Sequence, residues 1–443
     1  MGTLVNYSFQ LICLLADFFD ICHETRRIAR RTLQNFSLPE ATAQAESEAP
    51  MPTSINFFEE ATALKEQLVA WRRDIHQMPE IGLETPKTSS YIQSELTKLG
   101  IPFHTIINGS GVVGTIGEGE PCLMLRSDID GLPMAEESDE EFASTNGNMH
   151  ACGHDMHAAT LLGAAHILKA HESELKGTVK LFFQPGEEGY NGSDEAIAEG
   201  VLENPHVDRA FAMHVVSTVP TGVIVYGERP MAAAYNWAIV VEGVAGHGSM
   251  PDSCVDPITA AAHIHIGLQE ILAREISPMS ELVITCGAFN AGDAGNAIPQ
   301  SATMQGTIRV FDKKTEELAK KRIAEIASGI AQTYRCTATT TFGRPSPAVF
   351  NDSEFMKQCV EYTKQTLPQA QLYGGAHGMG SEDFGSISQA CTANYMMIGA
   401  AAGPINECYG QHNPHVRFNE NALPMSCAIY ASVAMNWLDD NMK

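Results

Sequence analysis

The organisation of this chain follows from one stretch, Cys122-Leu123-Met124-Leu125-Arg126-Ser127-Asp128-Ile129-Asp130-Gly131. It begins with a nearly continuous apolar run, which is typical of a strand that is buried on both faces in a parallel sheet. Two aspartates and a glycine follow, so the chain leaves the strand through a polar turn. Because ligands bind outside the carboxyl ends of strands in open α/β sheets, the stretch predicts a central strand with a site at its end.

Strands and helices alternate on both sides of this stretch. Apolar runs at residues 111–116, 177–184 and 208–214 predict further strands, and helical periodicity at 155–171 and 192–201 predicts the helices between them. This alternation is typical of an α/β domain with a mostly parallel sheet flanked by helices. The other elements predicted for this domain are helices at 56–79, 87–99, 352–366 and 422–438 and a strand at 394–399.

The pattern changes near Ala234. Strand, helix, strand, strand, helix and strand are predicted in that order at residues 236–243, 254–274, 282–290, 302–310, 315–333 and 336–343. This βαββαβ order is ferredoxin-like. We therefore expect an inserted lid or dimerisation domain at 235–345, within a discontinuous catalytic metal-binding domain at 51–234 and 346–443.

Composition narrows the class of protein. The chain carries 28 basic and 53 acidic side chains, a formal charge of −25, which argues against nucleic acid or an anionic membrane as a partner. No apolar run is long enough to span a bilayer. The 11 cysteines include no Cys-x-x-Cys pair, which favours reduced thiols in the cytoplasm over a disulfide framework.

The N-terminal segment does not resemble a signal peptide. Its apolar run, Leu11–Ala16, precedes the basic residues Arg26–Arg31 rather than following them, and Asp17 and Asp20 interrupt it. Residues 38–55 are rich in Ala, Glu, Ser and Pro, as linkers are. We expect residues 1–50 to be a mobile extension.

Possible metal ligands gather in Met149-His150-Ala151-Cys152-Gly153-His154-Asp155-Met156-His157, because thiolate and imidazole suit Zn, Mn, Ni or Co. Glu187 and Glu188 follow the strand at 177–184, and His214 closes the strand at 208–214. Each feature alone has an ordinary interpretation as a turn, a solvated face or a hydrogen-bonded histidine. Their arrival at several strand ends together predicts a metal site with a general base beside it. A late histidine, His412, could complete the set.

Eight segments occur in an order that is specific to one family: residues 73–80, 127–133, 149–157, 184–188, 246–251, 296–299, 379–384 and 412–414. They include Arg73-Asp74-Ile75-His76, Gly246-His247-Gly248-Ser249-Met250-Pro251 and Ser381-Glu382-Asp383. Over residues 56–440 the chain resembles the M20 metallopeptidases. The similarity is to the amidohydrolase branch, which includes hippurate hydrolases, N-acyl-amino-acid amidohydrolases and plant auxin-conjugate hydrolases.

The resemblance implies a centre of two divalent cations, manganese by family habit, with zinc, nickel or cobalt as alternatives. The implied ligands are Cys152, His154, Glu188, His214 and His412. Glu187 is implied as the general base, which takes a proton from the attacking water and passes it to the leaving nitrogen. The resemblance also implies a homodimer formed through the inserted domain.

Further roles follow from the resemblance. His247 would donate to the oxyanion and reach substrate, often across the dimer. Asp130 would orient a ligand histidine, and Asn296 and Arg309 would hold the substrate's carboxylate. We expect Asp128 and His157 to be structural. The chain departs from the branch at Asp252, where a histidine is usual, and His415 lies close enough to compete with His412.

The predicted function is metal-dependent hydrolysis of the amide bond of N-acyl or N-aroyl amino acids, as in hippurate hydrolase. One alternative is a dipeptidase or carboxypeptidase that uses the same machinery on a free N-terminal amine. Another is a non-catalytic dimer that binds amino-acid derivatives. That last alternative would need a broken ligand set, and all five implied ligands are present.

Overall fold

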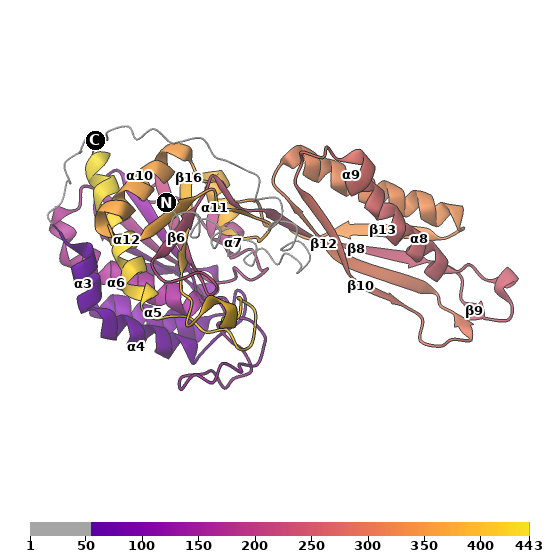
Figure 1. Cartoon of the computed structure of the whole chain (residues 1–443), viewed down its shortest axis with the longest axis horizontal. Helices are drawn as coiled ribbons and strands as arrows, with labels where there is room; N and C mark the ends of the chain where they lie inside the picture. The colour runs from indigo at the N-terminus through magenta and orange to yellow at the C-terminus, as the bar shows by residue number, and fades with distance from the viewer. Residues whose placement is uncertain (1–54, 443) are drawn as a thin grey trace, which may run out of the picture. The chain divides into compact units, whose positions relative to one another are not determined.

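The computed structural model describes residues 55–442, so the extension expected at residues 1–50 lies outside the described residues. The chain divides into two compact units (Figure 1). The first runs to Pro230 and also includes Phe350–Ala376 and Ile387–Lys443. The second comprises Met231–Val349 and His377–Ser386.

The first unit is built on an eight-stranded sheet in the order β1-β2-β4-β3-β5-β16-β6-β14. The central strands β4, β3, β5 and β16 run parallel, whereas β2 and β6 pair antiparallel to their inner neighbours. Every residue of β3 and β4 is buried, as the apolar runs predicted. The strand bounds are β1 Phe103–Ile106, β2 Gly111–Gly117, β3 Cys122–Asp128, β4 Thr178–Gln184, β5 Arg209–Val216, β6 Val223–Tyr226, β14 Gln371–Gly374 and β16 Thr392–Gly399.

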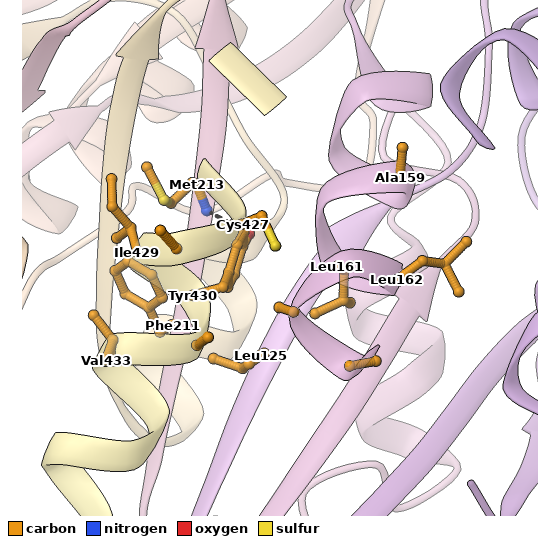
Figure 2. Close-up of a cluster of buried hydrophobic side chains, with 14 of the residues drawn as sticks. Leu125, Ala159, Leu161, Leu162, Phe211, Met213, Cys427, Ile429, Tyr430 and Val433 are labelled. Carbon is orange, nitrogen blue, oxygen red and sulfur yellow. Dashed lines mark hydrogen bonds between the residues drawn. The ribbon is translucent and has the colours of Figure 1, made fainter. Parts of the chain in front are cut away.

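Helices cover this sheet, with α12 at the centre of the packing. It contacts α3, α6 and α10, and α6 in turn contacts α4. Figure 2 shows Tyr430 of α12 beside Phe211 of β5. The Tyr430 hydroxyl donates to the Arg126 carbonyl (2.7 Å) and accepts from the Met213 amide (2.8 Å), which fixes α12 to β3 and β5. The helix bounds are α3 Phe57–Ala63, α4 Lys65–His76, α5 Pro86–Lys98, α6 His154–Ala170, α7 Gly192–Ala198, α10 Ser353–Thr366, α11 Phe384–Ala390 and α12 Ala422–Asp440.

The second unit is a four-stranded antiparallel sheet in the order β10-β12-β8-β13, with α8 packed against α9. Along β8, Tyr235, Trp237, Ile239 and Val241 are buried and the residues between them are more exposed, which is the period of a sheet covered on one face. The bounds are β8 Ala233–Glu242, α8 Pro257–Glu270, β10 Leu282–Ala291, β12 Ser301–Val310, α9 Lys313–Thr333 and β13 Thr337–Phe342. The predicted βαββαβ order and α/β class are confirmed.

Three local expectations differ from the structure. The helix expected at 56–79 is two helices that meet at Leu64. The helix expected at 254–274 begins only at Pro257, because Asp256 caps it, and its last turn, Ile271–Glu275, is a π-helix. Within the eight-stranded sheet, strands β1, β6 and β14 were not predicted, since four residues are too few to show a period. Within residues 55–442, every helix is too short or too polar to cross a bilayer.

Candidate metal centre

The predicted ligands all lie in the first unit, near the carboxyl ends of its parallel strands. The structure brings them together in overlapping sets of side chains, with the candidate ligand atoms of each set within 4.8 Å of one another, and two of these sets consist of predicted ligands only. We call Cys152, His154 and His214 the inner group. We call Cys152, Glu188 and His412 the outer group. Cys152 belongs to both.

His154 provides the test of whether a cation fits here. Its Nδ1 bonds the Asp130 carbonyl at 2.9 Å, while its buried Nε2 has no hydrogen-bond partner among the described residues. That Nε2 faces carboxylate oxygens of Glu187 at 3.9 Å, Glu188 at 4.0 Å and Asp128 at 3.8 Å. A buried polar atom without a partner is costly, and a bound cation would satisfy both the nitrogen and the acids around it.

Electrostatics at His154 agree with this fit. Burial alone would lower the pKa of His154, but the negative charges of Asp128, Asp130 and Glu188 outweigh burial and raise it to about 10. The same charges favour a divalent cation beside the imidazole. The neutral form of the His154 ring would then bind that cation.

Asp130 holds the ends of β3 and β4 in place. Its carboxylate accepts the backbone amides of Glu187 and Glu188, each at 3.1 Å, while its carbonyl receives His154 Nδ1. The side chain is buried, which raises its pKa. Asp130 thus positions one candidate ligand histidine and both glutamates of the loop after β4 from a single residue.

Cys152 and His214 approach each other within the inner group, with 3.4 Å between Sγ and Nε2. His214 Nδ1 bonds the Val215 carbonyl at 2.6 Å, so Nε2 is the nitrogen left to accept a proton or a cation. Burial, reinforced by Glu188 and Glu187, raises the pKa of the Cys152 thiol well above its ordinary value. Metal binding must therefore displace a proton from this thiol.

The outer group is more accessible. The His412 side chain is 54% exposed, and its Nε2 lies 3.1 Å from Glu188 Oε1, whose side chain is 11% exposed. His412 has a positive φ of 63°, and its amide donates to the Ala151 carbonyl at 3.0 Å. That bond ties the late loop to the segment that carries Cys152.

Two nearby histidines are not available as ligands. His157 bonds Asp128 through Nδ1 at 2.5 Å and accepts the Val215 amide through Nε2 at 2.9 Å, so both ring nitrogens are used. His415 bonds the Glu137 carbonyl through Nδ1 at 2.6 Å. His415 Nε2 also faces the Glu137 carboxylate at 3.4 Å. His412 therefore has no competitor in its own loop.

Sequence reasoning missed a buried polar network behind the ligands. Asp155 does not cap α6, which begins at His154 with Gly153 at its cap position. Asp155 instead accepts from Arg72 Nε at 2.9 Å and pairs with His76 Nδ1 at 2.8 Å, and His76 Nε2 reaches Glu136 at 3.0 Å. Arg72 also bonds Glu420 at 3.0 Å.

The Asp155 network (Arg72, His76, Glu136, Asp155 and Glu420) joins both ligand-bearing segments. Asp155 adjoins His154, and Glu136 precedes Glu137, whose amide donates to the Pro414 carbonyl at 2.8 Å in the His412 loop. Asp155 and Glu136 raise the pKa of His76 to about 9 against the effect of burial. The only sequence signal was the spacing of Arg72 and His76, which places both on one face of α4.

The other predicted site residues lie in the second unit. His247 pairs with Ala297 in the short ladder of β9 (Gly246–His247) with β11 (Ala297–Ile298), so it lies near Asn296, whose carbonyl accepts the Gly248 amide at 2.8 Å. Arg309 lies on β12, where its Nη1 donates to the Ile308 carbonyl at 3.2 Å. The structure thus brings His247 and Asn296 together and places Arg309 on a separate element. Asp252 lies in the exposed turn Pro251–Ser253.

Known proteins resemble this chain in sequence and in fold. Residues 124–436 match the sequence profile of Peptidase family M20/M25/M40. The chain belongs to this family. It is 36% identical over 403 residues to the IAA-amino acid hydrolase ILR1-like 2 of Arabidopsis thaliana, covering 89% of this chain and 91% of that relative. It is 33% identical over 382 residues to an N-acetylcysteine deacetylase of Bacillus subtilis (strain 168), covering 84% and 97%.

A solved structure agrees with the sequence relatives. A dinuclear metal-binding peptidase of the M20 family from Bacillus subtilis superposes with a TM-score of 0.73 at 31% identity, over 85% of this chain and 99% of that one. This member of the M20 family is accordingly a hydrolase that acts on amide bonds, with metal-binding side chains clustered at the strand ends.

Proposed function

We propose that the protein hydrolyses the amide bond of N-acyl or N-aroyl amino acids, releasing a carboxylic acid and a free amino acid. The observation that carries this proposal is the buried His154 Nε2, which has no partner among the described residues and faces Glu187, Glu188 and Asp128. The names of the two sequence relatives both denote an amino acid that carries an acyl group. Hippurate, an N-aroyl amino acid, is one candidate substrate.

The inner and outer groups would hold two divalent cations, with Cys152 contributing to both. When bound, such cations lower the pKa of an attacking water and polarise the scissile carbonyl. Thiolate and imidazole suit zinc, nickel or cobalt, whereas the carboxylates also suit manganese, which we propose as the native metal.

The remaining steps belong to the protein's own side chains. Glu187, held through its amide by Asp130, would accept the proton of the attacking water and return it to the departing nitrogen. His247 would donate to the developing oxyanion, and Asn296 and Arg309 would bind the substrate carboxylate. We propose that the protein is a homodimer formed through the second unit and that His247 serves the partner's centre. No disulfide joins the nine cysteines of the described part, which favours the cytoplasm.

A substrate panel tests the reaction. We expect manganese-loaded protein to hydrolyse N-acetyl and N-benzoyl amino acids and to leave the matching dipeptides with a free amine intact. Preference for the free dipeptides would instead establish the dipeptidase or carboxypeptidase alternative. Absence of turnover in protein that native mass spectrometry shows to hold two metal ions would support a binding protein.

A further inference from the structure

Tyr190 follows Glu187 and Glu188 in the loop after β4 and is half exposed, with 49% of its surface accessible. The loop that carries it is short and closed, because the Gly192 amide donates to the Gly186 carbonyl at 3.0 Å. Within the loop, the Gly189 amide donates to the Glu187 carbonyl at 2.6 Å. Tyr190 is thus held three residues from the proposed general base by a loop with little freedom.

One face of the Tyr190 ring rests on Gly82. A Cβ placed on Gly82 would lie 2.9 Å from Cγ, 2.9 Å from Cδ1 and 3.0 Å from Cδ2 of the ring. Near-equal distances to these three atoms place the Cβ position over the ring face rather than at its edge. Only glycine allows this approach, and Gly82 also has a positive φ of 63°.

The segment that contains Gly82 is hydrogen-bonded to the residue that follows Asp130. The Gly131 amide donates to the Glu80 carbonyl at 2.7 Å, and Ile81 forms a bridge with Gly131. Gly131 follows Asp130, whose carboxylate holds the amides of Glu187 and Glu188. The segment that includes Gly82 and the loop that carries the proposed general base are therefore anchored to the neighbouring residues Asp130 and Gly131, which tie the support of the ring to this loop.

We propose that the free face of Tyr190 forms part of the acyl-binding subsite and selects substrates with a flat aromatic acyl group, such as benzoyl or indolylacetyl. This inference rests on the proposed function. A supported ring with one open face can stack on a planar group without losing further side-chain freedom, and aromatic pairs favour such offset contacts. A small acetyl group gains almost nothing from the same face.

Matched substrates and variants test the inference. N-benzoylglycine and N-acetylglycine differ only in the acyl group, so their kcat/KM ratio reports the subsite. For Tyr190→Ala we expect kcat/KM to fall about tenfold or more for N-benzoylglycine, mainly through KM, and to change less than about twofold for N-acetylglycine. Tyr190→Phe should retain the benzoyl preference, and Tyr373→Ala, on edge strand β14 with four strands between it and β4, should behave as wild type.

A binding measurement separates recognition from turnover. In a Glu187→Gln background, calorimetry with N-benzoylglycine should show weaker binding when Tyr190→Ala is added. Gly82→Ala, whose Cβ would displace the ring, should lower the benzoyl preference in the same way. Equal loss for both acyl groups, or no loss in Tyr190→Ala, would overturn the inference while leaving the proposed reaction intact. Failure of wild-type protein to cleave either substrate would overturn the proposed function and the inference with it.

Discussion

The inner and outer groups share Cys152 but differ in how the fold holds them. His154 and His214 of the inner group lie on regular elements, at the start of α6 and within β5. Glu188 and His412 of the outer group lie on loops, and His412 is half exposed. Sites built on helices and strands are more rigid than sites on loops. If each group holds a cation as proposed, the inner position would be preorganised, whereas the outer position would depend on how two loops are tethered.

Glu187 borders both groups and is proposed to ligate neither cation, so changing it should separate chemistry from metal binding. We expect Glu187→Gln to lower kcat by about 10³-fold or more, because the proton acceptor is lost, while both metal ions stay bound. Steady-state kinetics together with elemental analysis check this. Loss of metal in parallel with activity would make Glu187 a ligand instead.

Cys152 is the member common to both groups. We expect Cys152→Ser to lower occupancy at both positions, since a serine hydroxyl is a far weaker acid than a thiol and does not supply a thiolate ligand. Elemental analysis after dialysis should find well under two metal ions per chain. Retention of two ions would exclude Cys152 from the centre.

His412 belongs to the outer group alone. His412→Ala should cost about one metal ion per chain and leave the melting temperature of the metal-free protein nearly unchanged, because more than half of the side chain is exposed. Native mass spectrometry counts the ions. As a control, His415→Ala should keep both ions, since His415 bonds Glu137 rather than the centre. Equal metal loss in the two variants would contradict the proposal that His412 is a ligand and His415 is not.

His76 lies behind both groups in the Asp155 network. Replacing it should therefore change how the proposed ligands are positioned and should not remove a ligand. We expect His76→Gln to weaken metal binding about tenfold, as changes to groups that orient ligands do. Competition with a chelator measures the affinity. Unchanged affinity would limit the network to a role in stability.

The same residue predicts a modest pH effect on stability. The pKa of His76 is raised to about 9 from an ordinary value of 6.5, so its charge stabilises the fold fully below pH 6.5. That contribution should be lost as pH rises from 6.5 to 9, lowering the free energy of unfolding by about 1–3 kcal/mol relative to His76→Gln. Urea denaturation of both proteins across this range tests it, and parallel curves would contradict it.

The fold was predictable because the spacing of apolar residues, which distinguishes strands from helices, can be read from short stretches of sequence. Apolar runs such as residues 122–127 identified the parallel strands, and parallel strands bring their carboxyl ends to one edge. That geometry is why Glu187, Glu188 and His214 could be expected near Cys152 before any coordinates.

The hydrogen-bond and packing partners of individual side chains in distant segments were not predictable. Nothing in the sequence near Asp155 shows that Arg72 and His76 would use its carboxylate. The support of Tyr190 by Gly82 likewise depends on two loops that meet only after folding. The assignment of His377–Ser386 to the second unit has the same origin, since its neighbours in sequence belong to the first.

The strand order also constrains how the chain folds while it is synthesised on the ribosome. β16 lies between β5 and β6, although it is synthesised long after both. At the usual speed of translation the nascent chain must wait on the order of ten seconds or more for this strand. His412 emerges later still. A truncated or stalled product therefore has neither the complete eight-stranded sheet nor the full set of proposed ligands, and only a nearly finished polypeptide could bind metal at every proposed position.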